Sequence, residues 1–344
     1  MGRFSPTFLA QVAADEVAEQ FGFYFRDPER HLRHYLDHRA LALSADANGG
    51  VPYVMWGRLG NWKASSYLRS DGNVFWLRTD ELDAFVAQVL PHLRRRIVLV
   101  TSEADYAPLL HAPAAVEKIL ASDMVGHWYC AQTDIPREVA KHTALPLGLP
   151  YPYRNDIHFG ARWLDIAAHW TRRYEPEQFD RTLAELVRAR KPPAARKAIA
   201  FADFSLNNTS QFAPWGETRG QIAQKLAGND AVTFLPGRVD QFSLYCLYGE
   251  HAFVLSPFGR GRDCYRTWEA LLMGAIPIVK TSPLDAAFDG FPVVLIEDWS
   301  EVTAENLSRW QARHAGAWDD GAVDRRLTLS YWVDRIRAKA ATLA

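Results

Sequence analysis

The chain has 344 residues, against about 100–150 for a typical domain, so two domains are expected. Apolar residues make up 48% and charged residues 23% of it, which excludes a disordered chain, a collagen-like repeat and a small disulfide scaffold. Thirty-nine basic residues stand against forty acidic ones, giving a net charge of −1. Because nucleic-acid binders normally carry a basic excess, no nucleic-acid partner is expected.

The cysteines and the apolar runs favour a cytoplasmic protein. The three cysteines lie far apart and show no CxxC or metal-ligand spacing, as in a reducing compartment. The first residues contain no apolar signal core, and the apolar run 270–279 has half the ~20 residues needed to cross a bilayer. The basic run Arg94–Arg96 predicts at most a peripheral contact with the inner face of an anionic membrane.

Helical and strand-like patterns alternate along the chain. Apolar residues at helical spacing predict helices over residues 7–43, with a break before Pro28. The N-terminal half then shows strands at 52–56, 74–77, 97–100 and 126–129, and helices at 80–93, 114–121 and 162–190. The C-terminal half shows strands at 198–202, 232–235, 252–256, 276–279 and 293–296, and helices at 219–227, 241–248, 264–273 and 323–341. This alternation predicts parallel sheets covered by helices on both faces.

Two prolines in the basic stretch 191–196 interrupt the alternation and predict a linker. The expected boundaries are an N-terminal α/β domain at 1–190, a linker at 191–197, a C-terminal α/β domain at 198–320 and a terminal helix within 321–344. Ligands of open α/β sheets bind at the carboxyl ends of the strands, so a central cleft between the two domains is the expected site.

The segment 253–280 carries the clearest chemical signal. An apolar strand runs into a loop that contains Gly259 and Gly261, flanked by Arg260 and Arg262. A glycine-bearing loop that opens a helix lets backbone N–H groups and the positive end of the helix face an anion. Two arginines beside such a loop could hold a diphosphate through charge-assisted hydrogen bonds.

The helix that follows adds a carboxylate to this pattern. It is expected to begin at Asp263 as N-cap and to end at Gly274. Arg262, Arg266 and Glu269 are spaced i, i+4 and i+7, which places them on one helix face. A carboxylate beside a phosphate site suits the two hydroxyls of a ribose, so the pattern predicts a nucleoside-diphosphate pocket. An ordinary surface ion pair and an ordinary turn remain the alternative, and the third glycine of GxGxxG is absent.

This segment resembles the exostosin-like glycosyltransferases, which carry a pattern close to FVLSPxGNGxDCHRTWEALxxGxIPIV. The likeness spans about residues 97–310 and includes 282–285, 291–302, 201–205 with Arg219, 128–134 and 145–149. The last three resemble the NFS…R, WFAQNxD and PIGL elements of the family. Arg260 replaces the Asn of the family, which could alter contacts with the phosphate or the sugar, and Tyr265 replaces a common His, which excludes a histidine role at this position.

The resemblance implies a GT-B fold, with two Rossmann-like domains facing a central cleft and the terminal helix packed back on the first domain. It also implies transfer of a sugar from a nucleoside-diphosphate sugar to a hydroxyl of a glycan or lipid-linked saccharide, with inversion and without a metal or other cofactor. The setting would be the synthesis of a surface polysaccharide or glycoconjugate. Residues 198–320 would bind the donor and 1–190 the acceptor.

Carried onto this sequence, the resemblance makes Glu269 the ligand of the donor ribose. Arg219 and Arg266 would neutralise the diphosphate and stabilise it as it leaves. The remaining donor-side candidates are Gly259, Arg260, Gly261, Arg262, Asp263 and Lys280.

An inverting transfer needs a base near the acceptor hydroxyl. Glu103 and Asp105 follow a predicted strand and are the leading candidates, with Asp134 and His127 behind them. Glu103 and Asp105 also match the carboxylate-x-carboxylate pattern with which GT-A enzymes hold a metal and a diphosphate, so a metal-dependent transferase remains an alternative. A non-catalytic glycan- or nucleotide-binding protein on the same scaffold is another, since the base is unassigned.

Overall fold

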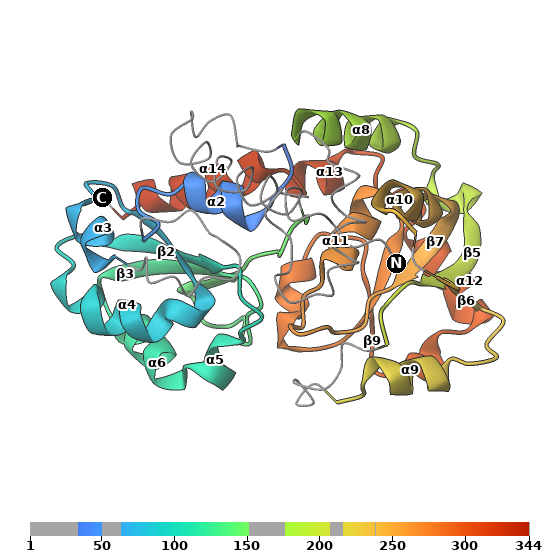
Figure 1. Ribbon diagram of the computed structural model, residues 1–344, viewed down its shortest axis with the longest axis horizontal. Coiled ribbons are helices and arrows are strands. Elements are labelled where there is room, and N and C mark those ends of the chain that lie inside the picture. Colours follow the sequence, from blue (N-terminus) through green and yellow to red (C-terminus); the bar gives the residue numbers. More distant parts are fainter. Residues whose placement is uncertain (1–33, 50–62, 151–175, 207–215, 238, 344) are drawn as a thin grey trace, which may run out of the picture.

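The computed structural model describes residues 34–49, 63–150, 176–206, 216–237 and 239–343 (Figure 1). The strand expected at 52–56 and the first parts of the helices expected at 7–43 and 162–190 lie outside the described residues. Within the described ranges, no helix combines the length and apolar character needed to cross a bilayer.

The N-terminal domain is built on a four-stranded parallel sheet in the order β1-β2-β3-β4. Its strands are β1 (Val74–Arg78), β2 (Ile97–Ser102), β3 (Val125–Cys130) and β4 (His142–Ala144). Helices α4 (Leu82–Gln88) and α6 (Pro113–Ala121) cover one face, and α2 (His38–Leu43) and α14 (Leu329–Ala341) cover the other (Figure 1). Since both faces are buried, β1 and β2 are almost wholly apolar and show no alternation with polar residues.

The C-terminal domain is built on a five-stranded parallel sheet in the order β6-β5-β7-β8-β9. Its strands are β5 (Lys197–Ala202), β6 (Val232–Phe234), β7 (His251–Leu255), β8 (Ile276–Lys280) and β9 (Val294–Ile296). Helices α8 (Pro176–Arg188), α10 (Gln241–Glu250) and α11 (Tyr265–Leu272) lie over one face, and α9 (Arg219–Lys225) and α12 (Ala304–Arg313) over the other. The predicted fold class, two parallel-sheet α/β domains, is confirmed.

The C-terminal segment crosses from one domain to the other. Helix α13 (Ala322–Arg326) packs on the C-terminal domain, and α14 packs on β1, β2 and α2 of the N-terminal domain. The prediction of one continuous helix over 323–341 is wrong, because Thr328 adopts an extended backbone and its hydroxyl accepts a hydrogen bond from the N–H of Tyr331, which starts α14.

Other elements also differ from the sequence-based expectation. In place of the single helix predicted over 80–93, the structure has α4 with a short 3-10 helix on each side, Thr79–Glu81 and Leu90–His92. Strand β4 and helix α12 were not predicted. The helix expected to begin at Asp263 begins at Tyr265, with Cys264 as its N-cap residue, so Asp263 is not the cap.

Gly274 ends α11 in the left-handed conformation with φ +77°, as the sequence predicted. A Cβ atom there would lie 2.6 Å from Nη2 of Arg196, whose guanidinium donates to three carbonyl groups. We expect Gly274→Ala to lower the free energy of unfolding by about 3 kcal/mol, because backbone strain adds to the disruption of these bonds. Gly228→Ala is the matched control, since φ is +76° but no atom lies within 4 Å, and should cost about 1 kcal/mol in urea titrations. Equal losses in the two variants would contradict the role given to Arg196.

Candidate functional site

Arg219, at the start of α9, holds the loop that connects β7 to α11. Its Nε donates to the carbonyl of Phe258 (2.8 Å) and its Nη2 to that of Pro257 (3.1 Å), with Sγ of Cys264 at 3.6 Å. The side chain is buried, and burial lowers its pKa. Among the described residues no partner contacts Nη1. The guanidinium therefore holds the loop through Nε and Nη2, and Nη1 could donate to a ligand.

Arg266 lies in the first turn of α11 and pairs with Asp203, which follows β5. Its Nε donates to Oδ1 of Asp203, whose Oδ2 accepts a hydrogen bond from the hydroxyl of Tyr248 (2.7 Å). Burial has the largest single effect and lowers the pKa of Arg266, but the charge and hydrogen bond of Asp203, together with Tyr248 and Cys264, raise it by more, so the net shift is upward. Its Nη groups have no hydrogen-bond partner in the described part of the chain. Arg266 is thus a charged, oriented side chain with donors available to an anion.

Glu269 lies three residues further along the same face of α11. Its Oε1 accepts hydrogen bonds from Nε2 of Gln241 (2.6 Å) and from the hydroxyl of Tyr245 (3.1 Å). The side chain is buried; burial and the charge of Asp203 raise its pKa to about 7. Its Oε2 accepts no hydrogen bond from the described residues. Glu269 is therefore held in one orientation and changes charge near neutral pH.

The loop residues do not form one simple phosphate cradle. The N–H of Gly259 donates to the carbonyl of Gly261 (2.9 Å), which closes a tight turn. Arg262 precedes α11 rather than lying on its face, so the expected alignment with Arg266 and Glu269 is wrong for this residue. Burial lowers the pKa of Arg262, and the charge of Asp134 in the N-terminal domain opposes this effect. The charge of Arg262 thus interacts with that of Asp134 across the two domains.

Asp263 is buried between the domains. Its Oδ2 accepts a hydrogen bond from the N–H of Leu147 (2.8 Å), and its Oδ1 accepts one from the indole of Trp268 (2.8 Å). Burial raises its pKa to about 7. Both carboxyl oxygens are used within the protein, so the structure places Asp263 at a contact between domains.

Asp105 follows the carboxyl end of β2 and faces the loop of the other domain. The residue is exposed to solvent, yet partial removal of its carboxyl group from water by the surrounding protein raises its pKa. The positive charges of Arg260 and Arg78 oppose this effect. The structure thus brings Asp105 and Arg260, from different domains, within electrostatic reach. Glu103, two residues earlier, has a left-handed backbone with φ +59°. Such a conformation is uncommon for a non-glycine residue and is often found near functional sites.

The other two candidate bases have structural partners. The carboxylate of Asp134 accepts hydrogen bonds from the N–H groups of Leu109 (2.8 Å) and Leu110 (3.0 Å), in the short helix α5 (Pro108–His111). Nε2 of His127 lies 2.8 Å from the hydroxyl of Thr143, and burial lowers the pKa of His127 to about 4. His127 is therefore neutral at physiological pH, and both residues have hydrogen-bond partners within the N-terminal domain.

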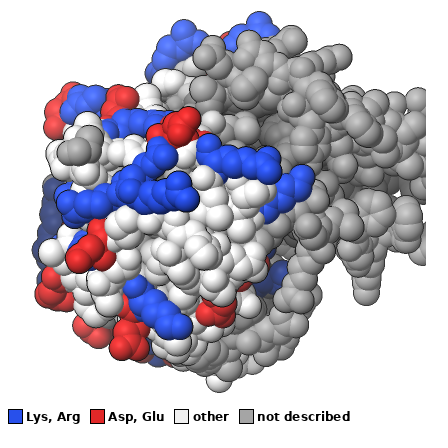
Figure 2. Space-filling view, turned by 90° about the vertical axis from the view of Figure 1, so that its left-hand side faces the viewer, with Lys and Arg blue, Asp and Glu red and all other residues white. Residues whose placement is uncertain are grey.

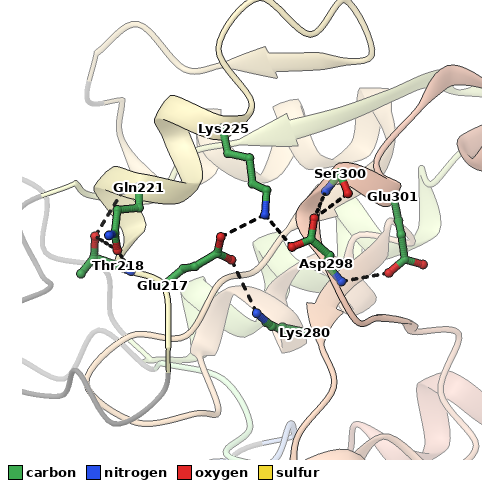
Figure 3. Close-up of polar contacts among 8 residues, drawn as sticks. All are labelled: Glu217, Thr218, Gln221, Lys225, Lys280, Asp298, Ser300 and Glu301. Atoms are coloured by element: carbon green, nitrogen blue, oxygen red, sulfur yellow. Dashed lines mark hydrogen bonds and ion pairs between the residues drawn. The ribbon is translucent and has the colours of Figure 1, made fainter.

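Lys280 lies at the end of β8 in a network of charged residues (Figure 3). Its ammonium group is 3.5 Å from Oε2 of Glu217, and Oε1 of Glu217 accepts a hydrogen bond from Lys225 (3.0 Å). Lys225 also reaches Asp298 at 2.5 Å. The network joins the start of α9 to the ends of β8 and β9, so the charge of Lys280 is balanced within the C-terminal domain.

The run Arg94–Arg96 directly precedes β2 in the N-terminal domain. Basic and acidic side chains are interspersed on the face of the molecule shown in Figure 2. Arg95 donates to the carbonyl of Asp71, and its Nη2 lies 3.6 Å from the carboxylate of that residue. Arg96 donates to the carbonyl of Asp123 (3.3 Å). Two of the three arginines thus have partners in neighbouring loops, and the membrane contact stays a prediction.

Four residues of the site were not singled out from the sequence: Gln132, Asp203, Gln241 and Tyr245. Asp203 and Gln132 lie inside the short segments 201–205 and 128–134, whose resemblance to the family was the only available signal. Within the described ranges, no three His, Cys, Asp or Glu side chains come together in an arrangement that could hold a metal ion.

No protein-family model matches the sequence, and a search of curated proteins finds no match. Solved structures with a similar fold include an alpha,alpha-trehalose 6-phosphate synthase from Burkholderia multivorans (15% identity, 81% of this chain and 74% of that chain covered, TM-score 0.42). A UDP-forming trehalose-phosphate synthase from Burkholderia xenovorans in complex with glucose-6-phosphate gives 13% identity, 83% and 78% coverage, and a TM-score of 0.40. The glycotransferase of kitacinnamycin shows 13% identity, with 86% of this chain and 82% of that chain covered and a TM-score of 0.31.

Removal of the charge of Asp203 is expected to destabilise the protein by about 3 kcal/mol, because Arg266, whose side chain is only 13% exposed, would lose its counter-charge. Asp203→Asn keeps the size of the side chain and an acceptor for Tyr248, so the loss measured by urea unfolding reports mainly on the ion pair. Asp289→Asn opens the exposed ion pair with Arg137 and should change little. Similar small effects in both variants would show that Arg266 does not depend on Asp203.

Proposed function

We propose that this chain is a glycosyltransferase that moves a sugar from a nucleoside-diphosphate sugar to a hydroxyl of a glycan or lipid-linked saccharide. The observation that carries the proposal is the pair Arg266 and Glu269 on one face of α11, each held by its own partners and each with hydrogen-bonding atoms that no described residue uses. A cation and a buried carboxylate side by side match a phosphate and a ribose on one ligand.

In this proposal the C-terminal domain binds the donor. Oε2 of Glu269 accepts hydrogen bonds from the two ribose hydroxyls, while the Nη groups of Arg266 donate to the phosphates. Arg260, Arg262 and Nη1 of Arg219 add positive charge around the loop with Gly259 and Gly261. Fixed cationic donors stabilise the negative charge that develops on the leaving diphosphate, so the proposed transfer needs no metal. The charge of Lys280 acts at longer range.

The N-terminal domain supplies the base. Asp105 accepts the proton of the acceptor hydroxyl while the oxygen attacks the anomeric carbon from the side opposite the diphosphate, which inverts the configuration. A carboxylate whose pKa is raised by its surroundings is a stronger base than a solvated one. Arg260, near Asp105, keeps the carboxylate ionised and lies between the two substrates. Synthesis of a surface polysaccharide or glycoconjugate, in the cytoplasm or at the inner membrane face, is the proposed setting.

The donor side is tested by calorimetric titration with UDP, GDP, CMP and their common sugar conjugates, with and without EDTA. We expect one nucleoside diphosphate to bind, EDTA to have no effect, and Glu269→Gln to weaken binding at pH 8 by about tenfold or more. The pKa of Glu269 is raised to about 7, so the ionised form that accepts from ribose grows as pH rises from 6 to 8. The ratio of wild-type to variant affinity should therefore increase over this range.

Three outcomes would contradict parts of this reading. A constant ratio between pH 6 and 8 would remove Glu269 from the ribose contact. Binding that requires a divalent metal would favour the GT-A alternative with Glu103 and Asp105. No binding of any nucleotide to the folded protein would leave a glycan-binding protein as the alternative.

The acceptor side is tested by Asp105→Asn. We expect this variant to lose transfer by about a hundredfold or more while nucleotide affinity stays within a few fold, because a general base acts on turnover and not on donor binding. Asp134→Asn is the matched control; it disturbs the hydrogen bonds to α5 and should affect stability but not the chemical step. Unchanged turnover in Asp105→Asn would exclude this residue as the base.

A further inference from the structure

One side chain of the N-terminal domain binds the backbone of the loop 257–264, which is called the donor loop below. Gln132 lies two residues after β3, is 2% exposed and has a left-handed backbone with φ +54°. Its Oε1 accepts a hydrogen bond from the N–H of Asp263 (2.8 Å), and its Nε2 donates to the carbonyl of the same residue (2.9 Å). A primary amide can satisfy both backbone groups at once, as a neighbouring strand would.

Gly261 makes this contact possible. A Cβ atom at residue 261 would lie 2.4 Å from Oε1 and 2.5 Å from Nε2 of Gln132, which is closer than atoms can approach. The φ angle of Gly261 is not in the left-handed region, so the backbone conformation alone does not require glycine here. Glycine is required here because the side chain of Gln132 occupies the space that a Cβ atom would need. Gly261 is thus explained by a contact between domains.

The same segment is held at two further points. The N–H of Leu147, from the N-terminal domain, donates to the buried carboxyl group of Asp263 (2.8 Å). Nε2 of His38, in α2, lies 2.5 Å from the hydroxyl of Tyr265, the first residue of α11. Residues 263–265 are therefore fixed by the N-terminal domain from three directions. Arg266 is the next residue along the chain.

We propose that Gln132 is a positioning residue for the donor site: it sets the conformation of the loop 257–264 and the place of Arg266 relative to Asp105. The role in donor binding rests on the proposed function, whereas the role in fixing the loop does not. In this view the donor loop reaches its binding conformation only when the two domains are docked. Gln132 touches no substrate and acts through the backbone of Asp263.

The test compares Gln132→Ala with Arg137→Ala in the full chain. The control breaks another contact between domains, the exposed pair of Arg137 with Asp289 (2.6 Å), which does not touch the loop. We expect Gln132→Ala to weaken the nucleoside diphosphate that binds the wild type by about tenfold and to speed amide hydrogen exchange across residues 259–264. Arg137→Ala should change neither. A folded Gln132→Ala protein with wild-type exchange in this loop would overturn the proposal.

Hydrogen exchange separates the two ways of failing. If no nucleotide binds the wild type, the proposed function fails, and exchange in the loop alone decides the role of Gln132. If the wild type binds a nucleotide and Gln132→Ala binds it equally well, the positioning role in donor binding fails while the proposed function stands.

A double-mutant cycle with Gly261→Ala gives a second readout. Gly261→Ala alone should speed exchange in the loop, because its methyl group displaces Gln132. In the Gln132→Ala background the same methyl group meets no amide, so adding it should have little further effect. If the two residues did not act through the same contact, the effects of the two substitutions on hydrogen exchange would add. Additive effects would therefore overturn the proposed contact between Gly261 and Gln132. If Gln132→Ala fails to fold, Gln132→Glu, which keeps the acceptor for the Asp263 N–H and loses the donor, replaces it in the exchange and binding measurements but not in the cycle, because its carboxylate still occupies the space beside Gly261.

Discussion

The burial of Asp263 between the two domains is the constraint on which the rest of the site depends. A carboxyl group removed from water needs hydrogen-bond donors, and Asp263 takes one from each domain, the N–H of Leu147 and the indole of Trp268. Its own N–H and carbonyl are satisfied by Gln132. Separation of the domains at this point would leave three polar groups of Asp263, its Oδ2, its N–H and its carbonyl, without these partners, so the junction favours one relative position of β3 and the loop after β7.

A second consequence concerns the charges around that loop. Arg266 has Asp203 as its counter-charge, and Lys280 has Glu217, so each cation is oriented within the C-terminal domain before any ligand is present. Arg260 differs, because its charge lowers the pKa of Asp105, a carboxylate of the other domain. Cations held in place by fixed partners need little reorganisation when an anion arrives, which is the condition for effective electrostatic stabilisation. Arg260 therefore connects the loop of the proposed donor site electrostatically with the proposed base in the other domain.

The fold could be predicted from the sequence where local signals decide it. The strands at 97–100 and 252–256 are continuous apolar runs, and the structure buries them on both faces. The prediction of one helix over 323–341 was wrong because apolar residues continue at helical spacing across Thr328. In the structure Thr328 is the N-cap residue of α14, and the helix is interrupted there. Strand β4 has three residues, too few for a pattern, and is defined by its pairing with β3.

The candidate site shows the same division between local and long-range information. Arg266 and Glu269 could be placed on one face because both lie within α11, where spacing determines direction. Arg262 could not, because it lies before α11, next to Asp263, whose backbone N–H donates to Gln132, 131 residues earlier in the chain. Gly261 is the clearest case: the sequence shows that a side chain is missing, but a phosphate and a neighbouring domain both need such a gap. At Gly261 the side chain of Gln132 occupies the gap, so a bound diphosphate would have to rely on arginine side chains more than on the glycine-rich backbone.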